Sequence, residues 1–462
     1  MTLTGPDAMT TSTTDSGLIH WFRQDLRLSD NPALARSIER ILARERTASG
    51  RRIDWLLPVF IHDPCQDEMT HWGFIRQGAH RRVVLADTLA ELTRRLEDLG
   101  STLIQLSGRP EVILPALVDG LGAAGLVCET IAAPEEEDCV SALRDAGLDV
   151  ETHWQSSLLD PRDLPFLAEQ VPNLFTAFRQ AVERAGVQPR ALAQTPDHLP
   201  PWPERRLAHW LAEQPRGLVS PPPVPSPRSD PRSAFPYAEP DCRGGERAAL
   251  EHLRQYCERG LPHQYKARRN RLSGFDDSSK LSPWLATGAL SARQALAAIR
   301  QFEAERGANE GTYWLWFELL WRDHFRFLHL RHGRALYRAA GLSSRPPPDH
   351  DPAAFARWCQ GQTGDALVDA GMRELAATGY LSNRMRQIVA SHLIHESGCD
   401  WRAGAAWLES QLVDYDVHSN QGNWLYIAGR GTDPRGGRRF DPVEQARVHD
   451  PDGRYRALWA SS

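Results

Sequence analysis

The chain has 462 residues, a length typical of about two or three domains, and 41% of the residues are hydrophobic and 24% charged. This composition excludes a peptide hormone or a disulfide-stabilised mini-protein, and no uncharged apolar run approaches the roughly eighteen residues that a membrane span needs. The net charge of −5 means that any contact with nucleic acid must come from a local basic patch.

The seven cysteines form no C-x-x-C pair, and residues 1–16, predicted to be a polar N-terminal tail, contain no signal-like apolar segment. We therefore expect the chain in a reducing compartment, the cytoplasm.

Residues 17–155 alternate between short apolar runs and amphipathic stretches. The apolar runs predict strands at 18–22, 55–61, 102–106, 126–128 and 150–154, with helices such as 82–99 between them. This alternation predicts an α/β domain with a doubly wound parallel sheet.

Residues 156–240 are predicted to form a Pro-rich connector, because 14 of the 33 prolines fall between 189 and 240. A helix or a central strand is excluded around Pro221, Pro222, Pro223, Pro225 and Pro227. From 241 to 462 the pattern predicts an all-α domain with helices at 246–258, 291–306, 312–332, 352–359, 366–377, 383–396 and 401–413.

A G-x-G-x-x-G pattern spans Gly120, Gly122 and Gly125. A dinucleotide-binding motif must follow a strand and open a helix, whereas these glycines close a helix and precede the strand at 126. We therefore interpret them as a helix cap and a turn. The histidine and cysteine spacings give no ligand cluster, so no metal site is predicted.

The segment 265–282 is a hydroxyl-dense turn that contains Lys280 and leads through Pro283 into a helix. Such a turn suits a pyrophosphate, although the segment taken alone is more typical of an ordinary Ser-capped helix. In the next long helix, Trp314, Phe317, Trp321 and Phe325 share one face, beside Glu318 and Arg322. This stripe predicts either a helical core or an aromatic-walled wet pocket.

Further along, Asp414, Asp416, Asn420 and Asn423 alternate with tryptophans and a tyrosine, which favours a buried polar cofactor over a surface.

Long, ordered motifs run through nearly the whole chain past residue 17. They are WFRQDLRLSDNPAL at 21–34, PNLFTAFRQAVE at 172–183, YKARRNRLSGFDDSSKLSPWLATGALS from Tyr265, ELLWRDHFRF from Glu318, and the block from Gly379 onward. With these motifs the chain resembles the photolyase/cryptochrome flavoproteins and, within them, the DASH cryptochromes.

The resemblance implies an FAD-binding helical domain. The implied cofactor residues are Tyr265, Ser278, Ser279, Lys280, Leu281, Ser282, Arg322, Asn383, Arg386, Asp414, Asp416 and Asn420. It also implies light-driven electron transfer from reduced FAD to a cyclobutane pyrimidine dimer in single-stranded DNA, contacted by Glu318, Trp321, Asn383, Gln387 and Tyr426. A basic rim is expected from Arg268, Arg269, Arg435, Arg438 and Arg439, with Lys266, Arg271 and Arg430.

The resemblance further implies photoreduction through Trp424 and Trp401, but Pro348 stands where a third tryptophan is usual. Trp358 is our substitute donor, and a core residue is the alternative. The implied antenna is 5,10-methenyltetrahydrofolate, held by Glu135 or Glu136, although these residues also fit an acidic helix start.

The resulting hypothesis is a monomeric DASH-type deoxyribodipyrimidine photo-lyase. Its rivals are a blue-light photoreceptor with little repair activity and a light-independent flavin redox enzyme. An intact set of lesion residues favours repair, and the missing nicotinamide motif disfavours the redox enzyme.

Overall fold

The structure is a computed structural model that describes residues 15–219, 221–225 and 230–460. Residues 1–14 of the predicted N-terminal tail lie outside the described residues, whereas Asp15 and Ser16 already belong to the first strand. Pro227 of the predicted connector also lies outside the described residues. Within the described ranges, no helix combines the length and the apolarity that a membrane span requires.

Five parallel strands form one sheet: β1 Asp15–Phe22, β2 Arg52–His62, β3 Ile104–Ser107, β4 Gly125–Glu129 and β5 Val150–His153. Their order is β3-β2-β1-β4-β5, so the winding direction reverses at β1, as in a doubly wound fold. The predicted strands and fold class are confirmed.

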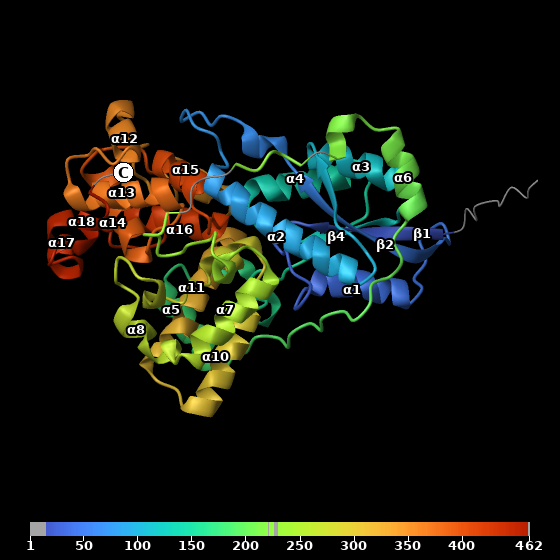
Figure 1. The fold of residues 1–462 in the computed structure, drawn as a ribbon, viewed down its shortest axis with the longest axis horizontal. Helices are drawn as coiled ribbons and strands as arrows, with labels where there is room; N and C mark the ends of the chain where they lie inside the picture. The colour runs from blue at the N-terminus through green and yellow to red at the C-terminus, as the bar shows by residue number, and fades with distance from the viewer. Residues whose placement is uncertain (1–14, 220, 226–229, 461–462) are drawn as a thin grey trace, which may run out of the picture.

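Helices cover both faces of this sheet, and each face has its own apolar core (Figure 1). Helices α1 (Pro32–Leu42) and α2 (Ala79–Asp98) cover one face, and α3 (Pro110–Leu121) and α4 (Pro134–Asp145) cover the other. Gly122 caps α3 with a φ of 66° and β4 follows at Gly125, so the interpretation of the glycine pattern as a cap and turn is confirmed.

The second half of the chain is helical, and all seven predicted helices are present to within two residues. Its helices are α7 Glu246–Glu258, α8 Tyr265–Arg268, α9 Ser282–Thr287, α10 Ala292–Arg306, α11 Glu310–His332, α12 Pro352–Cys359, α13 Ala366–Thr378, α14 Asn383–His395, α15 Trp401–Gln411, α16 Val417–Ala428, α17 Pro442–His449 and α18 Arg454–Leu458.

The segment predicted as a connector contains two helices that periodicity reasoning missed. Helix α5 (Phe175–Ala185) packs on α11, and α6 (Glu204–Ala212) packs on α3. The prolines do not prevent α6, because Pro203 lies at its N-cap, where no helical N–H is needed. The chain therefore passes from the sheet to the helical part at α5, returns to the sheet domain at α6, and enters the helical part again at α7.

The loop after β1 joins the two halves of the molecule. Asp30 forms a buried ion pair with Arg293 of α10 at 2.8 Å, and Glu246 of α7 accepts the backbone N–H of Leu28 at 2.7 Å. Gly288 follows α9 with a φ of 72°, and a Cβ there would lie 1.9 Å from the Gln24 carbonyl oxygen. This close approach fixes α9, which borders the site described below, against the sheet domain.

Candidate functional site

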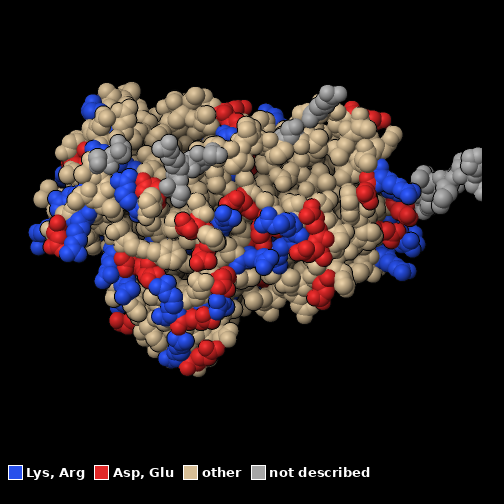
Figure 2. All heavy atoms as spheres, in the orientation of Figure 1, with Lys and Arg blue, Asp and Glu red and all other residues tan. Residues whose placement is uncertain are grey.

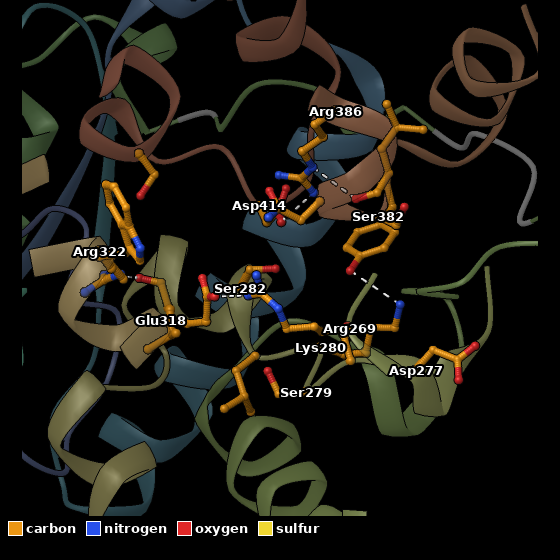
Figure 3. Close-up of a pocket in the computed structure, with 18 of the residues that line it drawn as sticks. Arg269, Asp277, Ser279, Lys280, Ser282, Glu318, Arg322, Ser382, Arg386 and Asp414 are labelled. Carbon is orange, nitrogen blue, oxygen red and sulfur yellow. Dashed lines mark hydrogen bonds and ion pairs between the residues drawn. The ribbon is translucent and has the colours of Figure 1, made fainter. Parts of the chain in front are cut away.

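A cavity of about 430 Å³ opens in the helical half of the molecule, between α8, α9, α11, α14 and α16 (Figure 3). Its walls include the predicted cofactor residues Tyr265, Ser278, Ser279, Lys280, Leu281, Ser282, Arg322, Asn383, Arg386, Asp414 and Asp416. Asn420 lines a smaller cavity of about 70 Å³ that shares Asn383, Arg386 and Asp414 with the main one. The structure therefore brings the whole predicted set together.

One side of the cavity is the hydroxyl-rich turn before α9. His252 donates from Nε2 to the Ser279 carbonyl at 2.8 Å, and Lys280 has a left-handed φ of 53°, which is uncommon for a residue other than glycine. The Lys280 ammonium lies 4.7 Å from the centre of the Tyr380 ring and, in the part of the chain described, has no carboxylate within ion-pair distance. A buried cation without a counter-charge suits an anionic ligand. Because α9 has only six residues, hydroxyls and Lys280 contribute more here than a helix dipole.

Arg386 and Asp414 lie together on another side of the cavity, as Figure 3 shows. Arg386 donates from Nη2 to Asp414 Oδ2 at 2.8 Å and from Nε to the Leu381 carbonyl at 3.0 Å. Burial alone lowers the pKa of Arg386, but the Asp414 carboxylate outweighs it and the net pKa is raised. The other oxygen of Asp414, Oδ1, is buried and has no partner among the described residues. This orphan acceptor fits a ligand that carries a hydrogen-bond donor.

Asp416 holds a second charged cluster beside the cavity. It caps α16 by accepting the Ser419 N–H at 2.8 Å, and it pairs with Arg326. Burial alone raises the pKa of Asp416, but the Arg326 and Arg322 guanidiniums hold it well below its ordinary value. Arg326 was missed from the sequence, although its spacing of four residues from Arg322 on α11 was a usable signal.

Aromatic side chains form another part of the cavity wall. Trp321 stacks on Phe175 with ring centres 3.8 Å apart and planes at 13°, and Tyr426 lies 6.2 Å from Trp321. Together with Glu318, Asn383 and Gln387, these residues place the whole predicted lesion set on the cavity wall. The aromatic stripe of α11 is thus partly a pocket wall. Phe175 was missed, because α5 was assigned to a connector.

The basic rim is largely neutralised within the protein. The ion pairs are Arg269–Glu318, Arg271–Asp277, Lys266–Glu310, Arg438–Asp433 and Arg439–Glu396. Arg430, expected at the mouth, is only 9% exposed, so its assignment to the rim is wrong. Figure 2 shows the same mixture of both charge signs over one face of the molecule.

The three predicted electron-transfer tryptophans, Trp424, Trp401 and Trp358, belong to one buried cluster of the helical half. Trp424 lines the small cavity and packs so closely on Gly404 of α15 that an added Cβ there would lie 2.2 Å from the indole. Trp401, at the start of α15, donates its indole N–H to the Ala339 carbonyl at 3.1 Å. Trp358 is completely buried and donates to the Val389 carbonyl at 2.9 Å, which agrees with the alternative of a core residue.

A separate cavity of about 260 Å³ lies between the carboxyl ends of β1 and β2 and the helical half. Both Glu135 and Glu136 line it, in the first turn of α4. Glu135 pairs with Arg76 at 2.6 Å, whereas burial raises the pKa of Glu136. In the described residues no group of three acidic, histidine or cysteine side chains is placed to hold a metal ion, and all seven cysteines are free thiols.

Comparisons with known proteins agree with this geometry. The family model "DNA photolyase" matches residues 18–201, and "FAD binding domain of DNA photolyase" matches residues 314–462. Cryptochrome DASH of Xenopus laevis is 41% identical over 451 residues, which cover 96% of this chain and 82% of the relative.

Two solved structures are also similar. The Synechocystis cryptochrome has a TM-score of 0.86 and 38% identity, covering 96% of this chain and 88% of its own. A bacterial class III photolyase from Agrobacterium tumefaciens has a TM-score of 0.74 and 29% identity, covering 98% of this chain and 88% of its own.

Proposed function

Because the chain belongs to the photolyase/cryptochrome family and, within it, to the DASH cryptochromes, we propose that it uses FAD and blue light to split cyclobutane pyrimidine dimers in single-stranded DNA. One observation carries this proposal: the residues suited to FAD and the residues suited to a lesion line the same cavity. We further propose that the protein acts as a monomer in the cytoplasm.

The cavity residues divide into two groups that fit the two ends of FAD. Ser279, Ser282 and Lys280 offer hydroxyls and a buried cation to the diphosphate, and Arg386 with Asp414 offers a donor and an orphan acceptor to the ring system. When bound in its reduced form and excited by blue light, FAD supplies one electron to the dimer and receives it back after the ring has split.

The aromatic wall positions the lesion. Stacking on Phe175 fixes the orientation of the Trp321 ring. Trp321 can therefore stack on a pyrimidine with little loss of side-chain conformational entropy on binding. Glu318 and Asn383 carry acceptors and an amide suited to the edges of the bases. Gln387 lies one turn from Asn383 on α14 and extends this polar edge.

The rim supports a preference for single strands. A dimer in a duplex must be flipped out of the stack, at a cost of a few kcal/mol. Phosphate contacts can offset that cost, but most arginines of this rim are already paired with carboxylates. Unstacked single strands avoid the cost altogether.

For the antenna, we propose that 5,10-methenyltetrahydrofolate binds in the cavity of about 260 Å³ between the two halves. Glu136 suits the pterin better than Glu135, because Glu135 already pairs with Arg76. Burial raises the pKa of Glu136, and a hydrogen-bond donor from a ligand stabilises its anionic form.

The test is repair of a single thymine dimer in matched single-stranded and duplex oligonucleotides by chemically prereduced protein, with and without blue light. We expect light-dependent repair of the single strand and much less of the duplex. Glu318→Gln should lower this repair, whereas Glu310→Gln is the matched control. Both glutamates lie on α11 and pair with a rim cation, but only Glu318 lines the cavity.

Equal repair of both substrates would contradict the strand preference. FAD-loaded protein that bleaches in light but repairs neither substrate would favour the photoreceptor.

A further inference from the structure

Tyr337 lies at the end of the short turn Gly333–Tyr337 that follows α11, and its hydroxyl is 3.0 Å from Nε2 of His329. The side chain is half-buried, packed against the apolar cluster that contains Trp401 and Trp424. Neither the lesion residues nor the cofactor residues account for this tyrosine–histidine pair.

The protonation of His329 is fixed by its surroundings. Nδ1 lies 2.8 Å from the Phe325 carbonyl, which accepts only, so Nδ1 carries the proton and Nε2 presents its lone pair. Burial lowers the pKa of His329 to about 4, so the ring is neutral at pH 7. The Phe325 carbonyl and Asp416 oppose this shift, and Arg326 supports it. Tyr337 therefore donates its O–H to a neutral base, the arrangement that proton transfer requires.

Tyr337 also shares a cavity with Trp401, the second of the predicted electron-transfer tryptophans. Trp401 and Tyr337 line one cavity of about 460 Å³, and Asn420 lines both this cavity and the small one that Trp424 borders. The turn is tied down at two points: Trp401 donates to the Ala339 carbonyl at 3.1 Å, and Gln421 donates to the Leu336 carbonyl at 2.7 Å. Oxidisable rings thus border both the small cavity beside the cofactor residues and a second cavity that shares Asn420 with it.

We propose that Tyr337 is the terminal electron donor of photoreduction in this protein, with His329 as its proton acceptor. This inference rests on the proposed function, because it requires an FAD oxidant. Trp424 loses one electron to photoexcited oxidised FAD, and Trp401 refills Trp424. Tyr337 then gives one electron to Trp401 while its O–H proton passes to Nε2 of His329. One O–H bond breaks and one N–H bond forms, leaving a neutral phenoxyl radical and an imidazolium. Tyr337 and His329 thus perform the role of the third tryptophan, whose usual sequence position is occupied by Pro348 in this chain.

Two other aromatic residues are weaker candidates. Tyr415 lines the same cavity as Trp401, but the Arg81 guanidinium lies 4.6 Å from its ring centre, where a positive charge opposes oxidation. In the described residues its phenol has no base within hydrogen-bond distance, unlike that of Tyr337. Trp358 is fully buried and does not line this cavity.

The test uses FAD-loaded full-length protein with oxidised flavin, flash illumination, transient absorption and freeze-trapped electron paramagnetic resonance. Ring-deuterated tyrosine identifies a tyrosyl radical by its changed hyperfine pattern. We expect that radical in the wild type and in Tyr415→Phe and Trp358→Phe, and its loss in Tyr337→Phe. His329→Gln keeps a polar partner but cannot take the proton, so the radical yield should fall at least about tenfold. Deuterated water should slow the decay of the tryptophan radical in the wild type but not in Tyr337→Phe.

The outcomes separate this inference from the proposed function. Failure to bind FAD, or light with no flavin reduction at all, overturns the proposed function. Flavin reduction and a tryptophan radical without a tyrosyl signal overturn the role of Tyr337 alone. A tyrosyl signal that survives Tyr337→Phe and disappears in Tyr415→Phe assigns the donor to Tyr415 and also overturns it.

Discussion

Replacement of Asp414 by asparagine is the most direct test of the cofactor cavity. The change preserves the shape of the side chain but removes the charge that faces Arg386, whose Nη2 lies 2.8 Å from Asp414 Oδ2. The Asp414 side chain is 1% exposed, so water does not replace the lost charge. The second oxygen, Oδ1, has no protein partner in the described residues and is our proposed acceptor for FAD.

The expected loss follows from the contacts. A hydrogen bond between charged groups contributes about 1.5–3 kcal/mol, and each 1.4 kcal/mol changes a dissociation constant about tenfold. If the loss falls on the bound cofactor, Asp414→Asn should weaken FAD binding by about 10- to 150-fold. The apoprotein should be destabilised as well, because Arg386 loses its charged partner and keeps only its bond to the Leu381 carbonyl.

The assay is titration of apoprotein with FAD, followed by quenching of flavin fluorescence, with thermal unfolding of the apoprotein measured in parallel. Asp433→Asn is the matched control. It also removes an arginine partner, Arg438 at 3.0 Å, but lies at the rim and not among the residues of the main cavity. A folded Asp414→Asn protein that binds FAD within about twofold of the wild type would refute our assignment of Asp414.

Three further changes test other parts of the structure. Trp321→Ala should weaken binding of a dimer-containing single strand by about 1–3 kcal/mol in a fluorescence anisotropy assay, without loss of FAD; unchanged affinity would remove Trp321 from the lesion contacts. Gly288→Ala should lower the midpoint of thermal unfolding far more than Gly147→Ala. Both glycines have a positive φ, but only an added Cβ at Gly288 meets a backbone carbonyl, that of Gln24. Equal midpoints would show that the backbone relaxes around the new Cβ and would contradict the proposed clash. Burial raises the pKa of Glu374 from 4.5 to about 8, so the folded state binds a proton that the unfolded state releases, and stability should fall as pH rises through that range. Glu374→Gln should flatten this part of the profile in denaturant titrations at several pH values, and an unchanged slope would contradict the buried acid.

Elements and motifs were predictable because their signals are local. Hydrophobic residues repeating with periods of 2 and 3.6 predicted the strands and the seven main helices. The glycines that precede β4 predicted the left-handed cap at Gly122. The cofactor residues were predictable for a different reason: long motifs carried a resemblance, and the fold then placed those residues around one cavity.

Other features were not predictable, because they depend on contacts between distant segments. Phe175 and Trp321 are far apart in the chain, and only the packing of α5 on α11 stacks their rings. Arg430 looked like a surface residue within an arginine-rich stretch, yet the fold buries it. The two connector helices were obscured by flanking prolines, which limit where a helix begins but do not forbid one nearby.

By itself, the sequence determined the fold class, the order of the elements and the set of residues available for FAD and for a lesion. The fold class and the order of the elements follow from periodicity, which neighbours along the chain dictate, whereas the FAD and lesion residues follow from the motifs that carry the family resemblance. Only the tertiary structure decided which charges remain free, since Glu318 neutralises Arg269 while Lys280 keeps no carboxylate partner among the described residues. It also decided that Tyr337, which meets the nearby His329, lines one cavity with the distant Trp401. Pairing of this kind depends on the angle and depth at which helices pack, which no single segment encodes.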